Sequence, residues 1–345
     1  MTTIAIAGLQ LQAGPGDNTA NMLEEIDRVM IRFPWIEMIV LPELNACGAD
    51  RSLAESLPGP TEARFRASAR SHGIWLIPGS LFEAAGDALY NTAPVIDPDG
   101  KVIARYRKQF PWLPYETGVT PGTDCVVFDV PGVARFGVSN CYDMWFPETI
   151  RTLAWMGAEI ILHPSLTSSI DREAEIAMIR AHGAQNQVYF FDVNLSGPLG
   201  VGQSCIAGPG GEVIYQGGRG REIIPLKLDL DYLRNVRREG WQNLGQPLKS
   251  FRDSSLRFPP YAEGHASEAL KGLGPLETPA RPESPRRRSR PGSAVGRSPS
   301  PRASPPSTRS GRACSSSRTS AARNRSRCCR KRNSSRHTIP TKARL

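Results

Sequence analysis

The chain has 345 residues, 39% of them hydrophobic, which is enough for one large domain or two ordinary ones with a buried core. Its net charge of +10 comes from the C-terminal end: from residue 265 onward 20 Lys and Arg stand against 3 Asp and Glu (+17), whereas residues 1–264 carry 23 against 30 (−7). The N-terminus lacks a basic stretch, and no apolar run approaches the ~18 residues of a membrane span, so we expect a cytoplasmic protein without membrane contact.

Strand and helix patterns alternate between residues 3 and 230. In chain order, the apolar periodicity and turn signals predict a strand at 3–9, a helix at 17–32, a strand at 37–44, a helix at 61–71, a strand at 73–79, a hairpin at 91–106, strands at 125–130 and 134–140, a helix from 147 to 157, a strand at 159–164, a helix at 171–187, a strand at 188–195 and a hairpin at 204–216. Strands that are apolar on both sides and alternate with helices indicate an α/β protein. The hairpins among them favour two stacked mixed sheets covered by helices, with a single doubly wound sheet as the alternative.

The seven cysteines show no metal-ligand spacing in the body of the chain, and their odd number favours free thiols in a reducing compartment. Cys141, in "GVSNCYDMWFPETI", stands at the end of a strand and shortly before a helix start. Backbone dipoles at such a place favour the thiolate, and the N–H of Tyr142 would face an oxygen held above the sulfur. The alternative is a buried structural cysteine, which is our interpretation of Cys125 and Cys205, and we expect no chemical role for Cys47.

A nucleophilic cysteine needs a base, and none of the five histidines stands in a cysteine-hydrolase signature. His163 ends the strand after Cys141, but a satisfied or solvated histidine is the plainer interpretation. Glu43 and Lys108 also follow predicted strands, and each alone would be an ordinary surface charge. Because ligands gather at the carboxyl ends of strands in α/β sheets, we expect Glu43, Lys108 and Cys141 to converge.

Three segments together resemble the nitrilase (carbon–nitrogen hydrolase) superfamily: "VLPELNACG", "YRKQFPWLPYETGVTPG" and "FGVSNCYDMWFPETIRTLAWMGAEIILHPS". The resemblance covers residues 3–230 and implies an αββα sandwich with Cys141 as nucleophile, Glu43 as general base and Lys108 as the cation beside the oxyanion. It also places a second glutamate at Glu116, in a "PW-x-P-x-E" stretch that is most like the aliphatic amidases and formamidases.

These roles predict hydrolysis of a small amide to a carboxylic acid and ammonia through a thioester. Nitriles and N-carbamoyl compounds are alternative substrates. The reaction requires no metal or organic cofactor, and the resemblance implies a homodimer or larger homo-oligomer. Five aromatic residues are candidates for the pocket wall, with core packing as the alternative: Trp112, Tyr115, Tyr142, Trp145 and Phe146.

The composition predicts three parts: a catalytic domain at 1–264, a docking segment at 265–281 and a disordered tail rich in Arg, Ser and Pro at 282–345. A basic tail of this kind would bind phosphates without sequence preference. We consider nucleic-acid binding less well supported than a solvating extension or an altered reading frame, because no folded nucleic-acid motif accompanies the tail. A catalytically silent binding protein is a further alternative.

Overall fold

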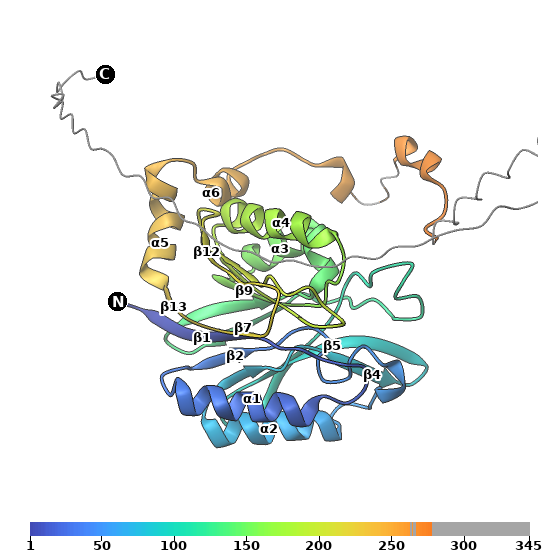
Figure 1. Cartoon of the computed structure of the whole chain (residues 1–345). Helices are drawn as coiled ribbons and strands as arrows, with labels where there is room; N and C mark the ends of the chain where they lie inside the picture. The colour runs from blue at the N-terminus through green and yellow to red at the C-terminus, as the bar shows by residue number, and fades with distance from the viewer. Residues whose placement is uncertain (263, 265–266, 278–345) are drawn as a thin grey trace, which may run out of the picture. The chain divides into compact units, whose positions relative to one another are not determined.

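Two mixed β-sheets stack face to face, with helices on both outer faces, in this computed structural model (Figure 1). The structure describes residues 1–262, 264 and 267–277, all of which fall in a unit that spans Met1–Arg281. The αββα arrangement predicted from the sequence is therefore confirmed, and the single doubly wound sheet is wrong.

Among the described residues, the first sheet has seven strands in the order β13-β1-β2-β3-β5-β4, with β6 paired to β5. Its strands are β1 (Thr3–Gln10), β2 (Met38–Val40), β3 (Trp75–Ile77), β4 (Leu81–Ala85), β5 (Ala88–Ile96), β6 (Val102–Arg107) and β13 (Glu222–Asp229). The second sheet has six, in the order β12-β11-β10-β9-β8-β7. They are β7 (Val126–Val130), β8 (Ala134–Val138), β9 (Ile160–Ser165), β10 (Tyr189–Asn194), β11 (Cys205–Ala207) and β12 (Val213–Gln216).

The helices lie on the outer faces of the two sheets. Helices α1 (Thr19–Arg32) and α2 (Pro60–His72) cover the first sheet, and α3 (Pro147–Trp155) and α4 (Asp171–Asn186) cover the second (Figure 1). Two more α-helices follow β13, α5 (Leu230–Glu239) and α6 (Pro247–Arg252). Short 3₁₀ helices occupy Arg51–Leu53, Cys141–Trp145, Trp241–Asn243, Pro259–Tyr261 and Glu268–Leu273. No helix of the described ranges is long and apolar enough to cross a membrane.

Strand β1 shows why the sequence contains continuous apolar runs. Ile4 and Ile6 point into the core between the sheets, where they join Phe191 and Val193 of β10. Ala5 and the other alternate residues of β1 face the opposite way, into a second core beneath α1 and α2. Because successive side chains of a strand point to opposite faces, a strand covered on both faces is apolar at every position.

Two strands and two α-helices were not predicted from the sequence: β4, β13, α5 and α6. Strand β13 pairs antiparallel with β1 along its whole length and forms the edge of the first sheet. Pro225 interrupts its alternation, and proline is accepted at such an edge because no further strand needs its missing N–H. The pairing joins segments more than 200 residues apart, so nothing in the local sequence indicates it.

The predicted domain boundaries remain predictions. Residues 282–345, which the sequence predicts to be a disordered tail, lie outside the described residues. The proposed docking segment is described only at 267–277, where Leu270, Leu273 and Leu276 are exposed.

The sheet directions bring several strand ends to one edge. Strands β1, β2 and β3 are parallel, and β6 runs the same way because β5 is antiparallel to both β3 and β6. In the second sheet β8, β9 and β10 are likewise parallel. The segments that follow β2, β6, β8 and β9 carry the residues of the candidate site.

A close backbone contact supports the segment after β2. Gly79 has φ +77°, and a Cβ atom at this position would lie 1.8 Å from the carbonyl oxygen of Pro42, which precedes Glu43. Gly86 has a similar φ of +60°, but a Cβ atom there would meet nothing within 4 Å. Alanine substitutions at these two glycines therefore distinguish the cost in stability of the left-handed backbone from the cost of the close contact.

We expect Gly79→Ala to lower the free energy of unfolding well beyond the roughly 1–2 kcal/mol that left-handed backbone costs an alanine. Gly86→Ala, which adds the same conformational strain without a collision, should stay within that range. Urea unfolding followed by circular dichroism measures both. Equal losses for the two variants would mean that the contact with Pro42 does not constrain this loop.

Candidate active site

Cys141 begins a tight turn that starts directly after strand β8. The residue has φ +49°, a left-handed backbone conformation that costs a non-glycine residue about 1 kcal/mol or more and that persists only where its surroundings fix it. The 3₁₀ helix Cys141–Trp145 follows, closed by reciprocal hydrogen bonds between Asn140 and Asp143. The turn therefore holds the sulfur in a fixed position at the strand end.

Asp143 ties this turn to the segment that carries Lys108. Its fully buried carboxylate accepts hydrogen bonds from the hydroxyl of Tyr106 (2.6 Å), the N–H of Phe110 (2.9 Å) and the N–H of Asn140 (2.8 Å). Burial raises the pKa of Asp143 to about 6, although these hydrogen bonds oppose the shift. The side chain of Asp143 therefore fixes the turn that carries Cys141, after the second sheet's β8, against the segment that carries Lys108, after the first sheet's β6.

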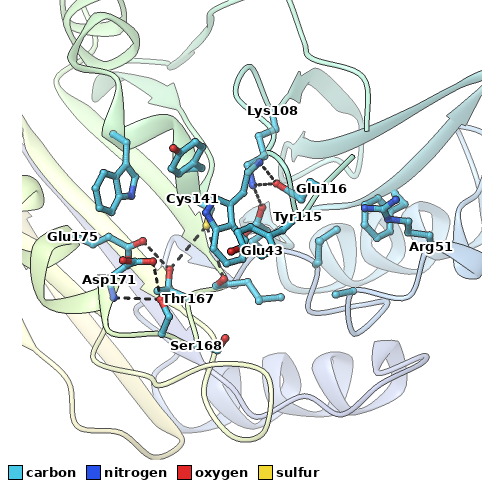
Figure 2. Close-up of a pocket in the computed structure, with 18 residues that line it drawn as sticks. Glu43, Arg51, Lys108, Tyr115, Glu116, Cys141, Thr167, Ser168, Asp171 and Glu175 are labelled. Atoms are coloured by element: carbon cyan, nitrogen blue, oxygen red, sulfur yellow. Dashed lines mark hydrogen bonds and ion pairs between the residues drawn. The ribbon is translucent and has the colours of Figure 1, made fainter. Parts of the chain in front are cut away.

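Lys108 bridges two carboxylates in the interior. Its Nζ lies 2.9 Å from Oε1 of Glu43 and 2.8 Å from Oε2 of Glu116 (Figure 2). The side chains of Lys108 and Glu43 are only 2% and 3% exposed. Asn91 of β5 also donates a hydrogen bond to Oε1 of Glu43, at 2.8 Å. The structure thus brings together the four ionisable groups that the sequence singled out: Glu43, Lys108, Glu116 and Cys141.

Burial and charge shift the pKa values of this group. Burial raises the pKa of Glu43, and Glu116 adds to the shift, while the charge of Lys108 opposes it. Burial alone would lower the pKa of Lys108, but the charges of Glu43, Cys141 and Glu116 raise it well above its usual range. Lys108 therefore stays protonated, and Glu43 is a stronger base than an exposed glutamate.

The thiol of Cys141 is neutral in this environment, contrary to the expectation that backbone dipoles favour the thiolate. Burial, followed by the negative charge of Glu43, raises the pKa of Cys141 well above its usual range, and Lys108 only partly offsets these effects. The sulfur contacts the carbonyl oxygen of Leu166 at 3.9 Å and Oγ1 of Thr167 at 4.0 Å. Desolvation exceeds the dipole effect because the residue is only 8% exposed.

These groups open into one pocket of about 260 Å³ (Figure 2). Apolar and aromatic side chains form much of its wall, and polar residues of the segment after β9 complete it. Its lining residues are Glu43, Leu44, Ala49, Arg51, Phe82, Lys108, Trp112, Tyr115, Glu116, Cys141, Tyr142, Trp145, Leu166, Thr167, Ser168, Ser169, Asp171 and Glu175.

Four of the five aromatic candidates line this pocket, and one does not. Trp112, Tyr115, Tyr142 and Trp145 are at the wall, whereas Phe146 stacks on Phe110 at a centroid distance of 3.6 Å. Since Tyr142 follows Cys141 in the tight turn, its backbone N–H remains our predicted oxyanion donor.

The remaining cysteine and histidine candidates lie outside the pocket wall. Cys47 is buried in an apolar cluster, and burial raises its pKa to about 11. His163 is fully buried behind the nucleophile turn, where its Nδ1 contacts Oγ of Ser139 at 2.6 Å. Burial lowers the pKa of His163 to about 3, so this histidine is neutral.

Sequence reasoning missed several residues of the site. Thr167 follows strand β9, so the same strand-end argument that selected Glu43 and Lys108 would have found it. Asn91 lies inside strand β5 and Glu175 inside helix α4, and no sequence signal distinguishes either from an ordinary polar residue. Arg51 and Asp171 line the pocket from the 3₁₀ helix before α2 and from the start of α4.

Comparison with known proteins places the chain among carbon–nitrogen hydrolases. The carbon–nitrogen hydrolase family profile matches residues 3–238. A formamidase of Bacillus cereus (strain Q1) is 30% identical over 233 residues, which cover 64% of this chain and 70% of the relative. Formamidases of Bacillus anthracis match to the same extent.

Solved structures of the nitrilase superfamily share the fold. Nit3 of Saccharomyces cerevisiae, a member of branch 10 of that superfamily, aligns with a TM-score of 0.64 and 26% identity over 69% of this chain and 94% of its own. An amidase of Nesterenkonia sp. AN1, in a variant crystallised with butyramide, aligns with a TM-score of 0.60 and 26% identity over 69% of this chain and 95% of its own. Another variant of that amidase carries the acetamide moiety of fluoroacetamide covalently on its active-site cysteine. The chain thus belongs to the carbon–nitrogen hydrolase family of the nitrilase superfamily, whose enzymes act through an active-site cysteine.

Proposed function

We propose that the protein hydrolyses short aliphatic amides to carboxylic acids and ammonia through a thioester on Cys141. The observation that carries this proposal is the convergence of one thiol, one buried base and one buried cation on a single pocket. The pocket, at about 260 Å³, is smaller than the roughly 300–1,000 Å³ typical of sites for drug-sized ligands. The relatives named formamidase and amidase support the same substrate class.

In the proposed reaction Glu43 removes the proton of the Cys141 thiol as the sulfur attacks the amide carbon. Negative charge then develops on the amide oxygen, where the ammonium of Lys108 and the N–H of Tyr142 stabilise it. Glu43 returns its proton to the departing nitrogen, which leaves as ammonia, and a thioester remains on Cys141. Glu43 next deprotonates a water that attacks the thioester, and the thiol recovers its proton as the acid leaves. Glu116 orients the substrate amide or the attacking water.

Several predictions from the sequence remain open beside this proposal. Nitriles and N-carbamoyl compounds can react through the same three groups, so they stay as alternative substrates. The homo-oligomer implied by the family resemblance stays a prediction. Nucleic-acid binding would depend on the basic tail, which lies outside the described residues. The intact Glu43–Lys108–Cys141 group argues against a catalytically silent binding protein.

Cys141→Ala should reduce ammonia release from acetamide or butyramide by on the order of 10⁴-fold or more, because no other cysteine of the described residues lines the pocket. Circular dichroism should remain that of the parent protein. Cys47→Ala is the matched control: it removes another buried cysteine near the site, and its turnover should stay close to that of the parent. Turnover that survives Cys141→Ala would refute the thioester route.

Glu43 must be ionised to act as a base, and burial raises its pKa above the ordinary 4.5. We therefore expect kcat/KM to fall with decreasing pH at a midpoint above 4.5, with activity present on the alkaline side of that midpoint. Glu116→Gln removes a negative charge that raises the pKa of Glu43, so its acid midpoint should move to lower pH. An acid midpoint that Glu116→Gln leaves unmoved would contradict the assignment of Glu43.

A substrate panel tests the proposed class. We expect kcat/KM to be highest for formamide, acetamide and butyramide, lower for bulkier amides that the small pocket cannot enclose, and lower for the corresponding nitriles and N-carbamoyl amino acids. Ammonia release measured at matched substrate concentrations provides the ranking. A nitrile or carbamoyl compound that exceeds every amide would replace the amidase assignment with that alternative.

A further inference from the structure

Two polar residues that the proposed reaction does not use lie against the nucleophile. Oγ1 of Thr167, two residues after the end of β9, is 4.0 Å from Sγ of Cys141. The same oxygen is 2.9 Å from Oε1 of Glu175, in the second turn of α4. Glu175 has a buried side chain that also lines the pocket (Figure 2). The three residues therefore form a chain of contacts from the thiol through a hydroxyl to a carboxylate.

The direction of these hydrogen bonds follows from the available protons. An ionised carboxylate can only accept, so the hydroxyl of Thr167 donates its single proton to Glu175. The oxygen of Thr167 then has only lone pairs to offer the sulfur. The other partner of the sulfur on this side, the carbonyl oxygen of Leu166 at 3.9 Å, is also an acceptor. Both contacts favour the protonated thiol as the donor.

A buried arginine pairs with Glu175, holds it in place and favours its ionised form. Burial raises the pKa of Glu175, and the charge of Arg172 opposes that shift. Nη1 of Arg172 lies 3.1 Å from Oε2 of Glu175, and its Nη2 pairs with Asp192 of β10. Nη2 also donates to the carbonyl oxygen of Gln203 at 2.9 Å, and Asp192 accepts from Oγ of Ser165 at 2.7 Å.

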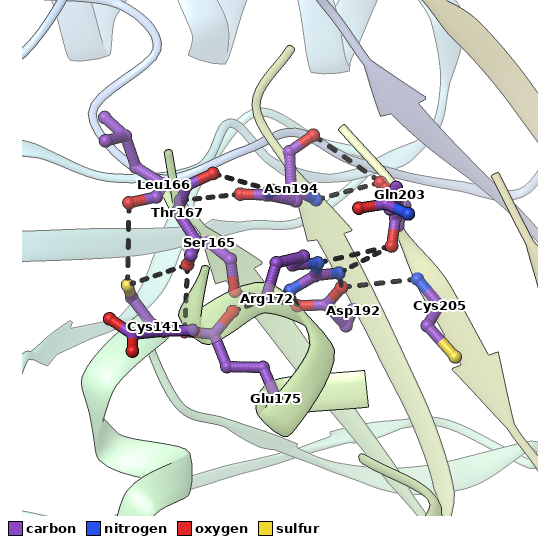
Figure 3. Close-up of polar contacts among 12 residues, drawn as sticks. Cys141, Ser165, Leu166, Thr167, Arg172, Glu175, Asp192, Asn194, Gln203 and Cys205 are labelled. Carbon is purple, nitrogen blue, oxygen red and sulfur yellow. Dashed lines mark hydrogen bonds and ion pairs between the residues drawn. The ribbon is translucent and has the colours of Figure 1, made fainter. Parts of the chain in front are cut away.

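Thr167 is held just as firmly as Glu175. Its backbone N–H donates to Oδ1 of Asn194 at 2.8 Å, and its carbonyl oxygen accepts from Nδ2 of Asn194 at 3.1 Å (Figure 3). The side chain of Asn194 thus fixes the backbone of Thr167 at both of its polar groups. With the backbone fixed, the hydrogen bond to Glu175 at 2.9 Å sets the direction of the hydroxyl.

We propose that Glu175 is a positioning residue for the nucleophile, acting through Thr167: by accepting the hydroxyl proton, it makes Thr167 an acceptor that holds Cys141 as a neutral, oriented thiol. This inference rests on the proposed function in so far as Cys141 is the nucleophile. Because a thiolate reacts with oxidants and electrophiles far faster than a thiol does, the arrangement keeps the resting enzyme unreactive. The thiol loses its proton to Glu43 only when a substrate carbon is in reach.

The effect of Glu175 can be separated from the other charges at the site. Glu43, Lys108, Glu116 and Glu175 face the thiol, and Arg172 and Asp192 face Glu175 in turn. The neutral His163 lies behind the turn. Among the charged groups that the structure describes, only Glu175 is linked to the sulfur through a hydroxyl, so removal of that hydroxyl isolates this contribution.

The test uses the full-length protein and Glu175→Gln. A glutamine will turn its oxygen toward Arg172 and its NH₂ toward Thr167, so the hydroxyl proton of Thr167 is released to point at the sulfur and stabilise the thiolate. Alkylation by iodoacetamide, followed as a function of pH in the peptide that contains Cys141, should then reach half of its maximal rate about one pH unit lower. Mass spectrometry of that peptide excludes signals from other cysteines.

Glu173→Gln is the matched control, because it removes an equal charge from an exposed position on the same helix. It should leave the alkylation profile unchanged. If Glu175→Gln shifts the profile no more than Glu173→Gln does, or shifts it to higher pH, the positioning role is refuted.

A double-variant cycle separates the contact through Thr167 from simple charge repulsion. In a Thr167→Val background, Glu175→Gln should shift the profile by clearly less than it does in the parent, because only the direct charge effect of Glu175 on the thiol remains. In a Thr167→Ser background, which keeps the hydroxyl, the full shift should persist. A shift in the Thr167→Val background that is as large as in the parent would mean that Glu175 acts by charge alone, and the inference would be wrong. Alkylation needs no amide turnover, so failure of this inference and failure of the proposed substrate class give different results.

Discussion

The site depends on one buried ammonium group. Removing a lysine from water costs several kcal/mol unless charged partners replace its hydration, and Lys108 is only 2% exposed. Glu43 and Glu116 supply those partners at 2.9 and 2.8 Å, and they come from segments that are remote from each other in the chain. Loss of either carboxylate would remove one of the two hydrogen-bonding partners that replace the hydration of the ammonium. The requirement for charge compensation thus fixes the segment after β2, the end of β6 and the loop that carries Glu116 relative to one another.

The same interior sets the protonation states that the proposed chemistry needs. Burial makes Glu43 less acidic than an exposed glutamate and Cys141 less acidic than an exposed cysteine, while Lys108 stays charged. In this resting state a neutral thiol lies beside a basic carboxylate. In the proposed reaction the thiol proton moves to Glu43 only when a substrate is bound. The acceptors at Leu166 and Thr167 stabilise that state from the other side of the sulfur.

Rigid supports surround the reactive groups in both sheets. Asp143 joins the nucleophile turn to the first sheet. It accepts hydrogen bonds from Tyr106 in strand β6 and from Phe110 in the loop that follows β6. On the second sheet, the ion pairs of Arg172 connect the start of α4 to β10. Positioning by such buried networks matters because small displacements of reacting groups reduce the rate strongly.

The sequence by itself determined most of the order of strands and helices, the two stacked sheets covered by helices, and the candidate residues Glu43, Lys108, Cys141 and Glu116. These features could be predicted because their signals are local. Each apolar run, strand end and motif lies within a short segment of the chain. The short β4, which pairs within a hairpin, and the proline-interrupted β13 gave weaker signals, and β13 is defined by pairing with a strand at the other end of the domain.

Only the tertiary structure decided the protonation of Cys141 and the involvement of Thr167 and Glu175. Both depend on desolvation and on hydrogen-bond direction, which are properties of the packed interior. A glutamate in the middle of a helix looks like a solvated surface charge in the sequence. It becomes part of the site because folding buries it beside Arg172 and within reach of the hydroxyl that contacts the sulfur.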